Sequence, residues 1–212
     1  MQAFTMLTGV AAPLLRDNID TDVIIRMDRL HGQPREHLAR YALEAIRIRS
    51  DGMPDPASPL NADALRDAPI LLAGANFGCG SSREGAVWAL RARGIRCVIA
   101  ESFGDIFFSN CFQNGVLPIR LAARDVQRLA DASAGAAPLT VDLARRTITA
   151  TSGNNGNDAG KVIEIAFAVD ALQRECLLQG LDAIDSTLTR SAAIDAWQAA
   201  DRLAHPWVWE GA

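Results

Sequence analysis

The sequence has very little lysine, since Lys161 is the only one among 212 residues and arginine supplies the other basic side chains. Acidic residues outnumber basic ones by 25 to 21, which gives a formal net charge of −4 and a sequence pI near 5.4. Proteins that hold phosphate backbones concentrate positive charge on one face or one helix. No such basic field is encoded, and we therefore do not expect nucleic acid to be a partner.

Long apolar runs are also scarce. The first twenty residues lack a basic segment, and Thr8, Gly9 and Pro13 interrupt their apolar stretch, so the pattern is neither that of a secretory signal nor that of a membrane span. We expect a cytoplasmic protein without a membrane partner. A chain of 212 residues with 49% hydrophobic content is long enough for one main core, and we expect residues 1–212 to form one domain.

The few cysteines and histidines are spaced unlike metal ligands. The four cysteines, Cys79, Cys97, Cys111 and Cys176, form no C-x-x-C pair, which argues against a zinc site or an iron–sulfur cluster held by this chain alone. The three histidines stand in no context that suggests a partner for a thiolate. A catalytic role for Cys79 is therefore disfavoured, and the cysteines are expected to be free thiols.

Strand patterns alternate with helical ones through the middle of the chain. Short apolar or β-branched runs predict strands at residues 70–77, 95–102 and 116–121. Helical spacing predicts helices between them, one ending at Gly94 and the next at Asn114-Gly115. This order predicts an α/β fold with a mainly parallel sheet core flanked by helices.

The second half of the sequence reads differently. Residues 138–150 predict a β-hairpin, residues 161–168 predict a further strand, and the polar residues 151–158 between them predict a loop. Residues 50–60, with three prolines and a glycine, predict an exposed loop. From about residue 169 to 205 the pattern is helical, with Leu172, Cys176, Leu177 and Leu181 on one face; this segment is expected to pack on the domain or to extend from it.

The stretch Asn76 to Gly85, NFGCGSSREG, is a glycine-rich loop that opens a helix. No lysine follows its glycines as a Walker A loop requires, and Arg83 stands where a dinucleotide fingerprint needs its third glycine. Ser81 and Glu84 fit a capping box, which is a purely structural explanation. That explanation leaves Ser82 and Arg83 unused.

A functional interpretation accounts for these remaining residues. Backbone N–H groups at a helix start attract a small anion, and the planar fork of arginine suits a carboxylate. The loop is thus interpreted as a carboxylate clamp made of Ser82 and Arg83, with the hydroxyl of Ser81 beside it. The structural and functional interpretations both remain open. The same holds for Asp20, Thr21 and Asp22, which fit a turn with an N-cap before an apolar run.

Three stretches carry a resemblance to a known family: NFGCGSSRE, NIDTDVII at residues 18–25, and SFGDIFFSNCFQNGVLPI at residues 102–119. Together they resemble the small subunits of 3-isopropylmalate dehydratase, which are a separate-chain version of the swivelling domain of aconitase. The resemblance implies an aconitase-like swivelling domain that closes over a 4Fe-4S cluster on a separate large subunit, with no cluster bound by this chain alone.

The resemblance also implies roles for the residues of the loop. Ser81 matches the serine that removes a proton as an alkoxide, and Ser82 and Arg83 match groups that bind the substrate carboxylate. Asp20, Thr21 and Asp22 match residues that support the site from behind the substrate-contacting ones. An alkoxide requires nearby N–H groups and a site closed to water, so the resemblance implies activity only in the assembled enzyme.

The sequence departs from the family pattern at two places. Gly85 stands where most members have histidine, which indicates either drift or a need for space. Residues 26–32, RMDRLHG, replace a segment that is expected to touch the variable part of the substrate. Arg26 and Arg29 are the cations available there, whereas Met27 and Leu30 are the apolar groups.

Three functions are consistent with the sequence. The first is the small subunit of a hydro-lyase that interconverts 2- and 3-isopropylmalate through 2-isopropylmaleate in leucine biosynthesis. The second is the same chemistry on another diacid, such as citraconate, dimethylmalate or homoaconitate. The third is an anion-binding module without catalysis.

Overall fold

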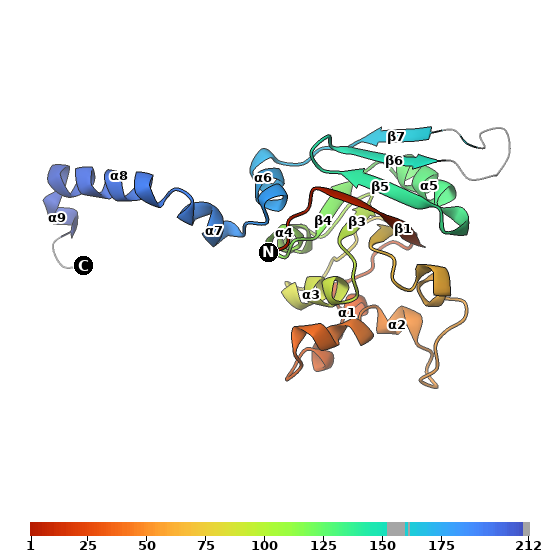
Figure 1. Ribbon diagram of the computed structural model, residues 1–212. Helices are drawn as coiled ribbons and strands as arrows, with labels where there is room; N and C mark the ends of the chain where they lie inside the picture. Colours follow the sequence, from red (N-terminus) through yellow and green to blue (C-terminus); the bar gives the residue numbers. More distant parts are fainter. Residues whose placement is uncertain (152–159, 161, 210–212) are drawn as a thin grey trace.

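A seven-stranded sheet forms the centre of the protein, in a computed structural model that describes residues 1–151, 160 and 162–209 (Figure 1). The strand order is β4-β3-β2-β1-β5-β6-β7. The pairs among β1 to β4 are parallel, whereas β1 pairs antiparallel with β5 and the rest of that half is antiparallel. The strands are β1 (Met6–Leu14), β2 (Ile70–Ala73), β3 (Cys97–Ala100), β4 (Leu117–Arg120), β5 (Pro138–Asp142), β6 (Thr147–Thr151) and β7 (Val162–Ala166).

Helices surround this sheet and continue beyond it. The α-helices are α1 (Thr21–Ile24), α2 (Glu44–Arg47), α3 (Glu84–Ala92), α4 (Asp105–Gln113), α5 (Ala123–Ala132), α6 (Ala171–Gln179), α7 (Ala183–Leu188), α8 (Ser191–Ala204) and α9 (Pro206–Trp209). Short 3₁₀ helices span Met27–Arg29, Arg35–Arg40, Pro59–Asn61, Asp63–Leu65 and Ala134–Ala136. The expected α/β fold is confirmed, with the refinement that only one half of the sheet is parallel.

The central strand β1 was not among the strands predicted from the sequence. It changes partner along its length: residues Met6–Val10 pair with β5, and residues Ala11–Leu14 pair with β2. The ladder with β5 therefore ends before Pro13, and a proline is tolerated where a strand has no neighbour on one side. Gly9 packs against the ring of Pro69, and an added Cβ would overlap it. Gly9 and Pro13, which made the strand hard to predict from the sequence, are thus both explained by their tertiary surroundings.

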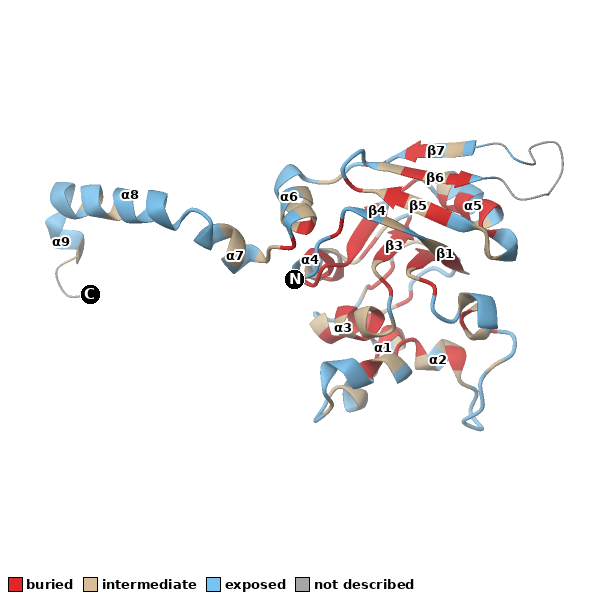
Figure 2. Cartoon of the chain, in the orientation of Figure 1, coloured by how far each residue is buried: buried red, intermediate tan, exposed pale blue. Residues whose placement is uncertain are grey.

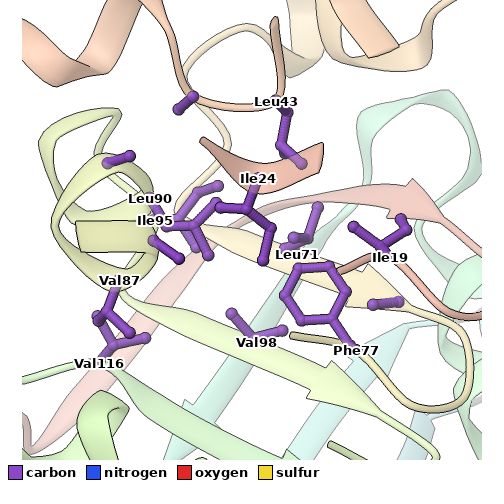
Figure 3. Close-up of a cluster of buried hydrophobic side chains, with 14 of the residues drawn as sticks. Ile19, Ile24, Leu43, Leu71, Phe77, Val87, Leu90, Ile95, Val98 and Val116 are labelled. Atoms are coloured by element: carbon purple, nitrogen blue, oxygen red, sulfur yellow. The ribbon is translucent and has the colours of Figure 1, made fainter. Parts of the chain in front are cut away.

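Alternation along the parallel strands builds two cores, one on each face of the sheet. Figure 2 shows that the buried residues lie on the strands and on parts of the surrounding helices. Leu71 and Val98 point to one face, and Ile70 and Ile99 point to the other. The first face is covered by α1 to α4, and Figure 3 shows its packed side chains, with Phe77 and Leu90 among them. The second face is covered by α5 and α6. The sheet is therefore buried on both faces.

The predicted helix ends agree with the structure. The helix α3 stops just before Gly94, whose φ of 93° is left-handed, and α4 is followed by Asn114 and Gly115. The hairpin of β5 and β6 is confirmed as well, while the predicted loop at 151–158 lies almost wholly outside the described residues. The predicted exposure of residues 50–60 is wrong at its end, because Leu60 is 1% exposed and belongs to the first core.

The chain after Gly180 leaves the sheet. Gly180 ends α6 in a left-handed conformation, and residues 182–209, here called the C-terminal arm, then project away from the body (Figure 1). Of the apolar face predicted for this region, Leu177 is fully buried, whereas Leu172 is 55% exposed. The predicted stripe therefore packs only in part, because the chain turns away from the core one turn later. No helix among the described residues is long and apolar enough to span a bilayer.

Candidate active site at the carboxyl ends of the parallel strands

Three separate stretches of chain meet just beyond the carboxyl ends of β1, β2 and β3. The N–H of Gly78 donates to the carbonyl of Ile19 at 2.7 Å, and the N–H of Thr21 donates to the carbonyl of Cys79 at 2.9 Å. On the other side, the N–H of Phe77 donates to the carbonyl of Ser102 at 3.0 Å. Parallel strands present their carboxyl ends at one edge, which is where open α/β sheets bind ligands. The three stretches that carry the family resemblance are therefore brought together here.

Two glycines allow this meeting of backbones. Gly78 has a φ of 70°, and a Cβ on it would overlap the ring of Phe107. A Cβ on Gly104 would lie 2.6 Å from the carbonyl oxygen of Gly78. Side chains at either position would push the loop away from α4. The glycine-rich composition of the loop is thus explained by close packing under it.

The hydroxyl of Ser81 lies at the surface, beside a buried threonine. The Oγ atoms of Ser81 and Thr21 are 3.3 Å apart, and the Thr21 hydroxyl donates to the carbonyl of Ser81 at 3.2 Å. Thr21 is 1% exposed, whereas Ser81 is exposed. Thr21 therefore contacts Ser81 from the buried side, and Ser81 stays accessible to solvent.

The predicted capping box is wrong. The helix α3 begins at Glu84 with Arg83 in the N-cap position, and no side chain caps it. Ser81 and Ser82 stay outside the helix, because Gly80 has a φ of 95° and the N–H of Arg83 donates to the carbonyl of Ser81 at 2.8 Å. The purely structural explanation for Ser81 is thereby removed.

Arg83 is a buried cation with incomplete hydrogen bonding. Its side chain is 14% exposed and forms an ion pair with Asp22 through Nη1. Neither Nη1 nor Nε makes a hydrogen bond of good geometry with the part of the chain that the structure describes. A buried guanidinium without its hydrogen bonds is costly, so this group is suited to an incoming carboxylate. Ser82, next to it, is exposed.

The three side chains of the stretch Asp20 to Asp22 make different contacts. Asp20 accepts a hydrogen bond from the N–H of Val23 at 2.7 Å and so caps α1. The N-cap interpretation is therefore correct for Asp20. Thr21 reaches Ser81, and Asp22 pairs with Arg83. The turn carries structural and site contacts at the same time.

One buried amide beside the site was not anticipated as part of it. Asn114, 6% exposed, donates to Glu84 Oε1 at 2.9 Å and accepts from Trp88 Nε1 at 3.1 Å. It thereby ties the end of α4 to the first turn of α3, directly after Arg83. In the sequence Asn114 reads only as a helix stop before Gly115, because its two partners lie 26 and 30 residues away.

The two departures from the family pattern lie against each other. A Cβ built on Gly85 would be 2.7 Å from both methyl groups of Leu30, which belongs to residues 26–32. Gly85 itself is buried at the start of α3. The glycine therefore meets a need for space: Leu30 occupies the volume that a larger residue at position 85 would fill.

Gly85→His should destabilise the protein by about 1–3 kcal/mol, because it overpacks a filled site. The same change in a Leu30→Ala background should cost less, since the space is then free. Urea unfolding of the four proteins in this cycle measures the coupling between the two positions. Additive effects would show that the contact between Leu30 and Gly85 does not explain the glycine.

The cysteines do not fit an iron–sulfur cluster. Cys97 and Cys111 are fully buried in the two cores, and burial raises the pKa of both thiols well above the ordinary value. Among the described residues, which include all four cysteines, no three histidine, cysteine or acidic side chains gather as metal ligands.

Comparison with known proteins assigns the family. Residues 1–124 match the model of the aconitase C-terminal domain. The chain is 49% identical over 210 residues to the 3-isopropylmalate dehydratase small subunit of Paramagnetospirillum magneticum, covering 98% of this chain and 100% of that protein. Identity to the same subunit of Rhizobium etli is 49% over 209 residues, covering 98% of this chain and 99% of that protein.

A solved structure gives the same result. The crystal structure of 3-isopropylmalate dehydratase (LeuD) from Methanocaldococcus jannaschii superposes with a TM-score of 0.64 at 26% identity, covering 90% of this chain and 98% of that chain. The resemblance carried by the three loop stretches is thus confirmed over nearly the whole sequence. The chain belongs to the 3-isopropylmalate dehydratase small subunits of the aconitase family.

Proposed function

We propose that this chain is the small subunit of a hydro-lyase that interconverts 2-isopropylmalate and 3-isopropylmalate through 2-isopropylmaleate in leucine biosynthesis. The proposal rests on one observation: the exposed hydroxyl of Ser81 lies two residues from Arg83, whose guanidinium is largely buried and incompletely hydrogen-bonded. The two stand in one turn at the ligand-binding edge of the sheet. The similarity to named small subunits along nearly the full chain supports the same activity.

The proposal includes a large subunit that carries a 4Fe-4S cluster, which the aconitase family implies. When bound, such a cluster supplies a Lewis acid for the leaving hydroxyl and a carboxylate of the substrate. The scattered cysteines of this chain support placing the cluster on the partner. The chain is further proposed to act as one cytoplasmic swivelling domain, residues 1–212, without nucleic acid or membrane partners.

The residues of this chain would share the work at the substrate. Arg83, with Ser82, binds a substrate carboxylate in place of the ion pair with Asp22. Ser81, after losing its own hydroxyl proton, would take the proton from the carbon beside a carboxylate and become a neutral hydroxyl again. The O–H of Thr21, 3.3 Å away, would donate to the charged Ser81 oxygen before that transfer. Asp20 holds Thr21 in place by capping α1. Because Ser81 is exposed in this chain, its activation requires a partner surface that excludes water.

The test is co-expression with the large subunit of the source organism and an anaerobic assay. We expect turnover of 3-isopropylmalate by the complex and none by either subunit alone. Turnover by the isolated small subunit would contradict the proposal. So would a cluster-loaded complex that converts none of a panel of hydroxy diacids, because that result favours a non-catalytic anion-binding module.

Substrate preference should favour an alkyl-substituted diacid over a tricarboxylate. Arg26 is paired with Asp28 at 3.0 Å, and Arg29 donates twice to Glu44, at 3.1 and 3.2 Å. The side chain of Arg26 is 62% exposed and that of Arg29 is 38% exposed. Arg26 and Arg29 each donate two hydrogen bonds to one carboxylate, unlike Arg83, whose Nε has no partner among the described residues. We therefore expect neither to bind a third substrate carboxylate, whereas Leu30 is an apolar neighbour.

The measurement is kcat/KM for 3-isopropylmalate, citraconate and homocitrate. We expect the first to be highest, with smaller diacids about 10- to 200-fold slower, because a pocket discriminates modestly per methylene. Arg26→Ala and Arg29→Ala should not alter this ranking. Arg49→Ala, which removes another surface arginine paired with an aspartate, is the matched control. A tricarboxylate preference that either site variant abolishes would contradict the assignment.

A further inference from the structure

The C-terminal arm is exposed or half-buried along its length (Figure 2), and it carries large apolar side chains. Trp197 is 63% exposed, Leu203 is 87% exposed and Trp207 is 67% exposed. Three of the four tryptophans of the protein lie in the arm, and none of the residues 182–209 is buried. Large apolar side chains gathered in one exposed segment are typical of an interaction site.

The tip of the arm is ordered by its own contacts. Trp209 donates from Nε1 to Asp201 Oδ2 at 3.0 Å, and Arg202 stacks over the same indole at 4.7 Å. His205 Nδ1 also lies 2.8 Å from Asp201 Oδ1. These contacts fold α9 back toward the end of α8. The arm therefore presents a preformed surface, which lowers the ordering cost of binding.

A groove opens where the arm leaves the body. Its volume is about 500 Å³, and it lies between α4, α6, α7 and the start of α8. The lining is largely apolar and includes Phe112, Leu172, Cys176 and Ile194. The groove continues the apolar surface of the arm onto the body.

The helix α4 connects this groove with the candidate active site. Its outer side carries Ile106, which is 52% exposed, and the exposed Ser109 and Gln113. The first end of α4 follows Gly104, which packs against Gly78, while Ser109 and Gln113 line the groove. One exposed strip thus runs from the catalytic loop along α4 to the base of the arm.

We infer that the C-terminal arm and this groove are a docking surface for the cluster-bearing large subunit. The inference rests on the proposed function, which already requires that subunit to cover Ser81 at one end of the strip. The similarity to the named small subunits spans nearly all of this chain, so those relatives possess the arm. The arm has four aspartates against two arginines, so the matching surface is apolar with basic groups around it.

The test measures the affinity of the full-length small subunit for the large subunit, without substrate. Trp197→Ala and Trp207→Ala, alone and together, should each weaken binding by about 30-fold or more, as buried tryptophan anchors do. Alanine preserves the helix. Met53→Ala, which trims another exposed side chain on a loop of the body, is the matched control and should bind normally. In the wild-type complex, tryptophan fluorescence should shift to shorter wavelength.

Further readouts separate docking from catalysis. Saturating large subunit should restore turnover of the arm variants to within about twofold of wild type, because they weaken association alone. Ser81→Ala should bind the large subunit normally. If the complex forms through the arm but converts no isopropylmalate, the proposed function fails while the docking surface stands.

Two outcomes would overturn the inference. The first is normal affinity of the double variant for the large subunit. The second is a wild-type small subunit that dimerises at micromolar concentration while the double variant is monomeric and binds the large subunit normally. That second result would assign the arm to a second copy of this chain.

Discussion

Replacing Ser81 by alanine should lower the turnover of the assembled enzyme by about 100- to 10,000-fold, the usual cost of losing a general base. The fold should survive, because the hydroxyl is exposed and its contact is to Thr21. Loss of one such hydrogen bond costs about 0.5–1.5 kcal/mol. Steady-state kinetics with saturating large subunit, together with urea unfolding, separate the two effects.

The matched control is Ser133→Ala. This change also removes one hydroxyl, which donates to the carbonyl of Ala130 at 3.0 Å at the end of α5. It should reduce stability slightly and leave kcat unchanged. Thr21→Val should lower kcat more than Thr21→Ser does, because serine keeps the oxygen next to Ser81. Near-normal turnover of Ser81→Ala would remove Ser81 from the mechanism.

Local sequence signals identify the parallel half of the fold. The strands β2 (ILLA) and β3 (CVIA) are short apolar runs, β4 (LPIR) is mainly apolar, and glycine follows each of the intervening helices. Such signals need no knowledge of partners. The strand β1 is different, because Gly9 and Pro13 fit it only through Pro69 and the end of the β5 ladder. Its place at the centre of the sheet follows from tertiary contacts that no local pattern contains.

The residues of the candidate site could be predicted from the sequence, but their contacts could not. Motif resemblance selected Ser81, Ser82 and Arg83, but the contact of Ser81 with Thr21 joins residues 60 positions apart. The capping box failed for a related reason. A left-handed turn at Gly80 holds Ser81 outside the helix, although Ser81 and Glu84 have the right spacing. Packing of this loop on α4 decides the conformation, and it is invisible in the ten residues themselves.

The C-terminal region shows the same limit on a larger scale. The periodicity after residue 169 predicts helix correctly, yet it cannot tell a face that packs internally from one that awaits a partner. Leu177 and Leu172 belong to one predicted stripe, but only Leu177 is buried. Gly180 ends α6 and redirects the chain. A hydrophobic stripe therefore predicts burial against some surface. Among the residues that the structure describes, Leu172 and the residues of the arm that follows are not buried.

Arg83→Lys should raise KM for isopropylmalate and lower kcat/KM by about 30- to 1,000-fold, although the charge is kept. The guanidinium is held in a buried position with Nε and Nη1 lacking good hydrogen bonds within the described chain. A guanidinium presents two parallel N–H donors along one edge to a carboxylate, whereas an ammonium offers no planar fork. Truncating one partner of a buried charged pair costs about 2–5 kcal/mol. Because lysine keeps the charge, we expect a loss of about 2–4 kcal/mol, which corresponds to the stated factor.

Comparing Arg83→Lys with Asp22→Asn decides whether the guanidinium of Arg83 binds the substrate or only pairs with Asp22. If Arg83 served merely to pair with Asp22, lysine would keep that ion pair while Asp22→Asn would remove it, so Arg83→Lys would be no more harmful than Asp22→Asn. In the proposed clamp, Asp22 is the group that the substrate carboxylate replaces, so Asp22→Asn should reduce kcat/KM far less than Arg83→Lys. The structure favours this order, since Asp22 is 60% exposed while the side chain of Arg83 is 14% exposed. Equal losses in the two variants would reduce Arg83 to a structural residue.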